Sequence, residues 1–160
     1  MQNSEAVNRI NAASVAEERG IRIHEEKEEV ASGGAGSVLT ISLHAKGGEA
    51  QATATVLHGR HPRLLSCDGI DVEAPLEGVL IYMRNRDVPG VIGRIGTILG
   101  EHKVNIANFA LGRAEKSKDG QPAIALAVVQ VDCPVAQTVL DALTAVDAIT
   151  EARVVNLGLA

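Results

Sequence analysis

Aromatic residues are almost missing from this sequence. Among 160 residues only Tyr82 and Phe109 are aromatic, and tryptophan is absent. The apolar fraction is nevertheless 46%, so a packed core is expected, built from valine, isoleucine, leucine and alanine. Proteins that bind single-stranded nucleic acid stack the bases on aromatic side chains, and the near absence of such side chains argues against that class.

An excess of positive charge and a long apolar run are missing as well. The net charge is −5, whereas a surface that binds nucleic acid is basic, so we expect no nucleic-acid partner. No apolar run approaches the ~20 residues of a membrane-spanning helix, and the first residues lack the basic and apolar parts of a signal peptide. We therefore expect a cytoplasmic protein without a membrane partner.

Cysteine is scarce, and its spacing carries no known chemistry. Cys67 and Cys133 belong to no Cys-x-x-Cys pair and to no Cys/His metal spacing, which indicates two reduced thiols in a cytosolic protein. Elsewhere no nucleophile stands beside a base and no pair of acids suggests a cleft. We expect no catalytic residue, no metal ion and no cofactor in this chain.

The first half of the chain predicts a helix and several strands. Apolar residues at helical spacing predict a helix over 4–19 that Gly20 ends, followed by a strand over 21–24. Apolar and polar residues then alternate on both sides of a glycine pair, which is typical of a β-hairpin. The four strands predicted beyond the helix region cover residues 39–46, 50–57, 63–66 and 70–72.

Residues 73–78 are interpreted as a linker, which divides the chain into two small α+β domains at 1–77 and 78–160. The second domain has the order β-α-β-β-α-β, the split βαβ plan of ferredoxin-like folds, with an antiparallel sheet and two helices on one face. Its predicted elements are strand 79–85, helix 90–102, strand 105–113, a turn at 115–121, strand 122–131, helix 134–146 and strand 149–156.

Two details of the second domain carry further expectations. The run from Ile124 to Val131 is apolar at nearly every position, which predicts a central strand covered by helices on one face and by a partner on the other. Pro134 is expected in the first turn of the second helix, where a proline is tolerated.

The segment from Asn85 to Ile92 carries the strongest functional signal. The first N–H groups of a helix lack internal partners, and the helix dipole favours an anion there. Pro89 has no N–H group, so the donors for a carboxylate are those of Gly90, Val91 and Ile92. Asp87 would face an ammonium group. A plain helix cap, worth ~1 kcal/mol, is an equally good interpretation of Asp87 from the residues alone.

Asparagine side chains complete the predicted site. They could bind a hydroxyl or an ammonium group, and two of them open the strand that follows the helix. The predicted effector-binding residues are Asn85, Asp87, Val88, Gly90, Val91, Ile92, Asn105 and Asn108.

Glycines recur along the first helix of the second domain. Their spacing is G-x-x-G-x-x-G instead of the G-x-G-x-x-G of a dinucleotide site, so a Rossmann interpretation is rejected. Each glycine inside a helix costs ~1 kcal/mol relative to alanine. Since Gly93, Gly96 and Gly100 share one face, we predict that another backbone approaches it closely, such as that of a partner subunit.

A basic patch lies in an otherwise acidic chain. Two arginines and two histidines in a loop between strands suit a phosphate or a carboxylate. The alternative is a solvated loop that balances the acidic run at 25–29. The predicted anion-binding residues are His58, Arg60, His61 and Arg63.

Residues 79–156 resemble an ACT domain, a small regulatory module that binds amino acids. The resemblance rests on Asp87-Val88-Pro89-Gly90, on the helix that runs to His102, and on Val104-Asn105-Ile106 at the start of the next strand. The family commonly shows Asp-Arg-Pro-Gly, and Val88 departs from that pattern. The resemblance implies a ligand site that senses an amino acid.

The whole chain is similar to the C-terminal part of the long D-3-phosphoglycerate dehydrogenases, an NAD-dependent family that begins serine synthesis. The motifs are Asn11-Ala12-Ala13, Gly59-Arg60-His61-Pro62-Arg63, Asp68-Gly69 and Arg84-Asn85-Arg86-Asp87.

That resemblance implies a partial allosteric substrate-binding domain that takes phosphate or substrate-like anions, followed by an ACT domain. It also implies that L-serine, or another small amino acid, binds as feedback effector between two subunits whose sheets join edge to edge. Asn85, Asp87 and Asn105 match effector-contacting positions of the family. The NAD-binding and catalytic domains of the parent enzyme are absent, so this chain is expected to be inactive alone.

Two other classes stay open. One is the β part of an iron–sulfur L-serine dehydratase, although the cluster needs several cysteine ligands and only two cysteines are present. The other is a free-standing ACT regulator that binds a partner protein.

Overall fold

The computed structural model describes residues 7–8, 10–27, 37–114 and 123–158. The chain divides into two compact units, Met1–Gly34 and Ala35–Ala160, and each is described by itself. The predicted turn at 115–121 lies outside the described residues. Among the described helices none is long and apolar enough to cross a membrane.

In its described residues the first unit contains one short helix, α1 (Ala12–Glu18). Gly20 has a φ of 73°, and the N–H groups of Gly20 and Ile21 donate to the carbonyls of Glu17 and Ala16, both at 2.8 Å. This is a Schellman motif, so the predicted helix stop at Gly20 is confirmed. Of the helix predicted over 4–19, residues 4–6 and 9 lie outside the described residues. Residues 10 and 11 form a turn before the helix, because Oδ1 of Asn8 accepts their backbone N–H groups.

The strand predicted over 21–24 is wrong. Residues 21–27 carry no regular structure, and their side chains are exposed. A strand gains its hydrogen bonds from a neighbouring strand, and no strand pairs with this segment among the described residues.

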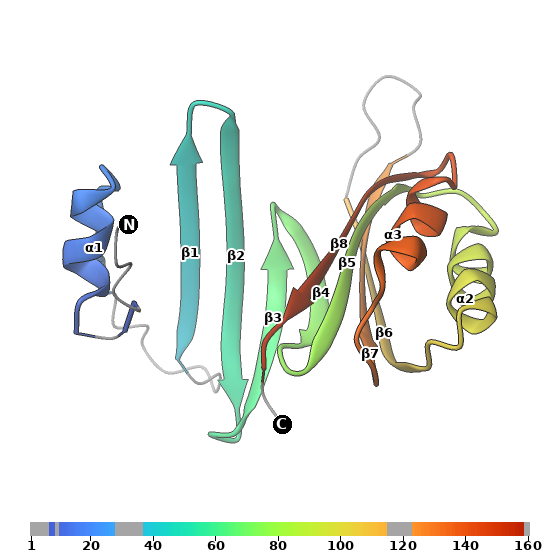
Figure 1. Ribbon diagram of the computed structural model, residues 1–160. Coiled ribbons are helices and arrows are strands. Elements are labelled where there is room, and N and C mark those ends of the chain that lie inside the picture. The colour runs from blue at the N-terminus through green and yellow to red at the C-terminus, as the bar shows by residue number, and fades with distance from the viewer. Residues whose placement is uncertain (1–6, 9, 28–36, 115–122, 159–160) are drawn as a thin grey trace, which may run out of the picture. The chain divides into compact units, whose positions relative to one another are not determined.

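An antiparallel sheet begins the second unit, with its strands in the order of the chain (Figure 1). The predicted hairpin and the two shorter strands are confirmed. The predicted linker is too long, because residues 73–75 continue the last strand, where Ala74 is fully buried. The strands are β1 (Val38–Ala45), β2 (Gly48–Leu57), β3 (His61–Cys67) and β4 (Ile70–Pro75).

A second antiparallel sheet with two helices follows. Its strand order is β6-β7-β5-β8, so the predicted β-α-β-β-α-β plan is confirmed. Pro134 lies outside the second helix, whose N-cap is the extended residue Ala136. The elements are β5 (Val79–Arg86), α2 (Val91–Glu101), β6 (Ile106–Arg113), β7 (Ile124–Val131), α3 (Gln137–Thr144) and β8 (Ile149–Asn156).

Both helices cover one face of the second sheet (Figure 1). Apolar residues of α2 recur at helical spacing and are buried, and α3 adds Val139 and Leu143. The strands supply fully buried partners such as Ile81, Met83 and Val129. This core fixes where α2 begins relative to the sheet.

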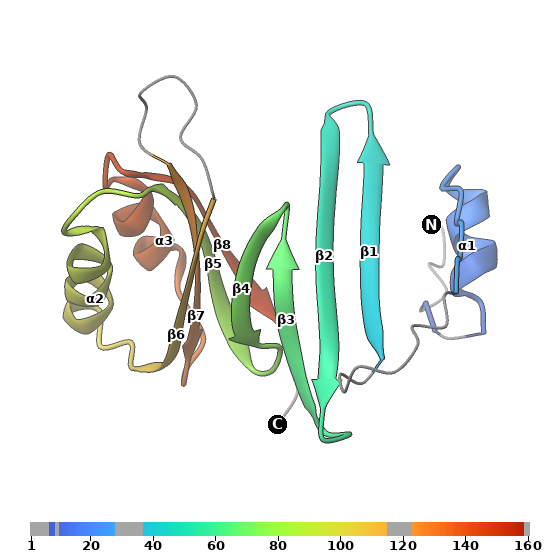
Figure 2. The ribbon, with the colours of Figure 1, turned by 180° about the vertical axis from the view of Figure 1, so that it is seen from behind.

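The other face of the second sheet packs against the first sheet (Figure 2). Leu126 and Val128 of β7 share a buried cluster with Leu64, Val72 and Ala74 of the first sheet. The prediction that β7 is a central strand covered on both faces is therefore confirmed. Its second cover comes from this chain itself, where a partner was predicted.

Candidate functional site

A cavity of about 250 Å³ opens at the start of α2. It lies where the chain leaves β5 and turns into the helix. Six of the eight predicted effector residues line it, namely Asn85, Asp87, Val88, Gly90, Val91 and Ile92, together with Pro89, Leu111 and Arg113.

No described side chain caps the helix at this cavity. The N-cap is Gly90, whose φ of 90° is left-handed, and it makes no side-chain capping hydrogen bond. Glycine adopts this conformation without strain. Asp87 therefore is not the helix cap, and the N–H groups of the first turn remain available to an anion.

Asn85 is buried in the wall of this cavity, with 3% of its surface exposed. Its Nδ2 donates to the backbone carbonyl of Arg86 at 2.9 Å, whereas its Oδ1 is buried and has no partner among the described residues. A buried acceptor without a partner costs about 1–3 kcal/mol. A hydrogen-bond donor on a ligand would remove that cost.

Asp87 is paired across the cavity with a residue that the sequence did not point to. Its Oδ2 lies 3.2 Å from Nε of Arg113, and the side chains are 26% and 66% exposed. Leu111 and Arg113 share one face of β6, since side chains alternate along a strand. The predicted topology could have indicated that Arg113 lies near Asp87. The strands β5 and β6 run in the same direction, so their last residues lie at the same end of the sheet.

Asn105 and Asn108 lie at the other end of β6. Ile106 and Val79 both pair with Val131, whereas Arg113 pairs with Ala125. Eight strand residues span roughly 25 Å, so in one chain the predicted residues form two separate groups.

The two distant asparagines differ in their contacts. Nδ2 of Asn105 donates to the carboxylate of Asp132. Oδ1 of Asn108 is buried and has no partner among the described residues.

The predicted anion patch lies at the β2–β3 turn. His58, Arg60 and His61 are exposed, and Nε of Arg60 donates to Nε2 of His61 at 3.1 Å. Arg63 follows on β3, and its Nε is buried without a partner among the described residues. Three side chains of the patch are thus exposed to solvent, and the guanidinium group of Arg63 is partly buried.

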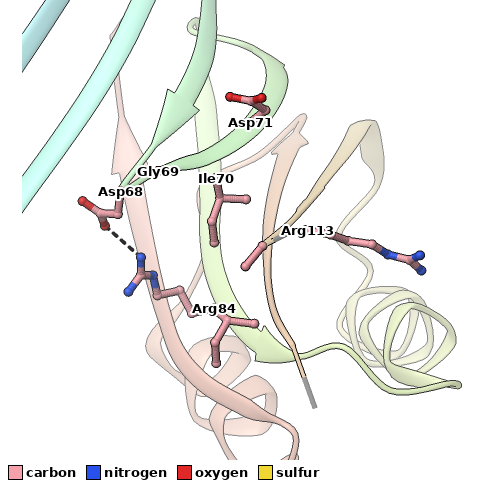
Figure 3. A pocket seen from close by; sticks show the side chains of 8 residues that line it. Asp68, Gly69, Ile70, Asp71, Arg84 and Arg113 are labelled. Carbon is pink, nitrogen blue, oxygen red and sulfur yellow. Dashed lines mark hydrogen bonds and ion pairs between the residues drawn. The ribbon is translucent and has the colours of Figure 1, made fainter. Parts of the chain in front are cut away.

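A second cavity, of about 380 Å³, lies beside the β3–β4 turn (Figure 3). Arg84 donates to Oδ2 of Asp68 at 3.0 Å, and Oδ1 of Asp68 accepts the backbone N–H of Gln51 at 2.8 Å. Arg113 borders this cavity too, but its side chain points away from Asp68. This ion pair joins the first sheet to β5 one residue before Asn85.

The two thiols lie on opposite faces of the second sheet. Cys67 packs against the cluster between the sheets, and Cys133 packs against the cluster under the helices. Burial raises the pKa of the Cys67 thiol, so it is poorly ionised at neutral pH. The thiols cannot bind one cluster together, and no group of metal-binding side chains occurs in the described part of the chain.

The glycine face of α2 is open within this chain. Apart from the adjoining residues and the nearby backbone of the helix itself, no described atom lies within 4 Å of the position that a Cβ would take at Gly93, Gly96 or Gly100. The predicted close approach therefore has no counterpart inside the described chain, and a partner subunit stays a prediction.

Comparison with known proteins finds a different family model for each part of the chain. Residues 79–148 match the ACT domain, and residues 1–68 match the D-3-phosphoglycerate dehydrogenase intervening domain.

Three curated D-3-phosphoglycerate dehydrogenases resemble nearly the whole chain. The chain is 35% identical to the one from Synechocystis sp. over 96% of its length. It is 31% identical to the one from Bacillus subtilis over 94% and 36% identical to the one from Archaeoglobus fulgidus over 96%. It spans only 26–28% of the length of these relatives.

Proposed function

The chain belongs to the D-3-phosphoglycerate dehydrogenase family and contains its ACT domain, and we propose that this region binds L-serine as a feedback effector. The observation that carries the proposal is that Oδ1 of Asn85, beside Asp87, is buried and has no partner among the described residues, at a helix start that no described side chain caps. These groups form one small polar cavity that is ready for a ligand.

The chemistry of the cavity matches the three polar groups of L-serine. Asp87 receives the ammonium group, and the N–H groups of the first turn of α2 receive the carboxylate. Oδ1 of Asn85 accepts a hydrogen bond from the hydroxyl group. The volume of about 250 Å³ is below the range of about 300–1,000 Å³ for drug-sized ligands, which supports a small amino acid.

A second subunit completes the site in this proposal. β6 is an edge strand, and two β6 strands that pair antiparallel bring the start of one beside the end of the other. Asn105 and Asn108 of the partner subunit would then approach the cavity, and both groups of predicted residues would form one site. Self-association through the ACT domain follows.

The longer protein would be a cytoplasmic, NAD-dependent oxidoreductase acting on 3-phosphoglycerate. In this proposal NAD and the substrate bind to regions of the relatives that this chain does not cover. The glycines along α2 are consistent with that division, because they lack the spacing of a dinucleotide site. The chain alone would sense the effector without activity.

We also propose that the patch of His58, Arg60, His61 and Arg63 binds an anion such as phosphate. Nε of Arg63 is buried without a partner among the described residues, and this favours an anion site over a purely solvated loop, because an unsatisfied charged donor is costly to bury. The dehydratase alternative gains no support, since Cys67 and Cys133 are on opposite faces of the second sheet.

Titration calorimetry with L-serine, glycine, L-alanine and D-serine tests the effector. We expect L-serine to bind most tightly, and we expect Asp87→Ala to weaken it by roughly 10- to 100-fold, because a hydrogen bond to a charged group contributes about 1.5–3 kcal/mol. Asp141→Ala, which removes an exposed carboxylate on α3, is the matched control.

Circular dichroism should show that Asp87→Ala stays folded, since Asp87 does not cap α2. The serine assignment is rejected if L-serine gives no heat while another amino acid binds. The site assignment is rejected if Asp87→Ala binds L-serine as tightly as the unmodified chain.

A further inference from the structure

Among the described residues that line the cavity at α2, Arg113 is the only cationic side chain and Asp87 is the only anionic one. The two stand together, with Nε of Arg113 3.2 Å from Oδ2 of Asp87. These lining side chains therefore carry no net charge, although the cavity contains a full positive and a full negative group. A ligand that carries one charge alone leaves one of the two groups uncompensated.

The ion pair leaves hydrogen-bonding atoms of both Arg113 and Asp87 available to a ligand. It uses Nε of Arg113 and Oδ2 of Asp87, and the terminal guanidinium nitrogens and Oδ1 of Asp87 have no partner among the described residues. A guanidinium group has five N–H donors in a planar fork, which suits a carboxylate. The pair thus presents a donor fork and an acceptor oxygen side by side.

The two partners differ in freedom of movement. The side chain of Arg113 is 66% exposed, whereas that of Asp87 is 26% exposed, and the Asp87 backbone N–H donates to the carbonyl of Ala123 at 2.7 Å. Asp87 is the fixed group, and Arg113 is the group that adjusts to a ligand. Exposed ion pairs are weak, so the adjustment costs little.

We infer that Arg113 determines the specificity of this cavity, by holding the α-carboxylate of the ligand together with the first turn of α2 while Asp87 holds the α-ammonium. The inference rests on the proposed amino-acid site and names its ligand class, a small zwitterion. An amine without a carboxylate leaves Arg113 unpaired and competes with it for Asp87. A carboxylate without an amine leaves Asp87 unpaired.

Paired titrations of the full chain with L-serine and with ethanolamine, which lacks the carboxylate, test this inference. In Arg113→Gln we expect the L-serine dissociation constant to rise by about 10- to 100-fold, since a charged hydrogen-bond partner is lost. Ethanolamine should bind several-fold more tightly, because Asp87 is no longer neutralised. If Arg113 had a purely structural role, its replacement would not change the affinities for L-serine and ethanolamine in opposite directions.

Two further variants keep the outcome clear. Arg153→Gln removes an exposed arginine on β8 that does not line the cavity, and it should change neither affinity. Arg113→Lys keeps the charge without the planar fork, so its L-serine affinity should lie between those of the unmodified chain and Arg113→Gln.

The possible failures are distinguishable. If L-serine binds the unmodified chain and needs Asp87, but binds Arg113→Gln equally well or better, Arg113 is not a specificity residue and the amino-acid site stands. If the unmodified chain binds no amino acid, both the proposed effector function and this inference are overturned.

Discussion

Gly112 is a single residue on which the contact of the two sheets depends. A Cβ at this position would clash with the backbone oxygen of Asp71 and would lie 2.8 Å from a methyl carbon of Ile70. Backbone atoms cannot yield as the end of a side chain does. We expect Gly112→Ala to lower the free energy of unfolding by about 1–3 kcal/mol, the usual cost of overpacking, measured by urea denaturation.

Gly93→Ala is the matched control for that measurement. Apart from the adjoining residues and the nearby helix backbone, no described atom lies within 4 Å of its Cβ position, and alanine is favoured over glycine in a helix by about 1 kcal/mol. This variant should be as stable as the unmodified chain or more stable. Equal stability of Gly112→Ala would mean that β4 and β6 do not pack as closely as described.

Single residues also show which parts of the candidate site could be predicted from the sequence and which could not. Asn85 and Asp87 were found because they precede a Pro-Gly pair at a helix start. Arg113 was missed, since a charged residue at the end of a strand is usually solvated and its partner Asp87 is distant in sequence. Asn105 was grouped with the cavity by its sequence position, although a strand–helix–strand crossover returns the chain to the opposite end of the sheet.

The open glycine face of α2 is a feature of one element. Gly96 is the central glycine of this face and has room for a side chain within the chain. We expect Gly96→Leu to fold with unchanged or higher thermal stability, and we expect it to weaken self-association at least tenfold if a partner backbone rests there. Sedimentation velocity over a concentration series measures the association.

Arg94→Leu is the control for added apolar area on the same helix. Arg94 is exposed on α2, and at 100° per residue it lies outside the face that the three glycines share. This variant should leave self-association unchanged. If Gly96→Leu alters neither self-association nor L-serine affinity, the glycine face is not an interface.

Elements were predicted best where their own pattern or the order of the elements along the chain was clear. The hairpin of β1 and β2 followed from alternation and a glycine turn, whereas the plan of the second sheet followed from its β-α-β-β-α-β order, although β5 pairs with the distant strands β7 and β8. The apolar run of β7 correctly indicated two covered faces, but sequence could not say that β3 and β4 supply the second cover. The prediction of a strand at 21–24 was wrong, because an alternating apolar pattern does not by itself supply a neighbouring strand for hydrogen bonding.

At the scale of the molecule, the two sheets of the second unit share one buried cluster. The predicted boundary between residues 77 and 78 falls between these sheets and stays a prediction. Since the cluster contains Leu64 and Val72 on one side and Leu126 and Val128 on the other, we expect both sheets to unfold in a single transition.

Urea unfolding followed by two probes measures this cooperativity. Tyr82 is the only tyrosine, tryptophan is absent, and Tyr82 packs against the shared cluster, so its fluorescence reports on the contact between the sheets. Far-ultraviolet circular dichroism reports on all strands and should give the same midpoint. Two separate midpoints would mean that the sheets are independent domains.

The second sheet has two edge strands, β6 and β8, and they differ in what pairing with another molecule would produce. Two β6 edges related by a two-fold axis form a closed pair, whereas β6 of one molecule on β8 of the next would extend without end. β8 carries the charged residues Glu151 and Arg153, and its register with β5 shifts beside Asn85, which are features that discourage edge pairing. The asymmetry of the edges thus favours a finite assembly over a fibre.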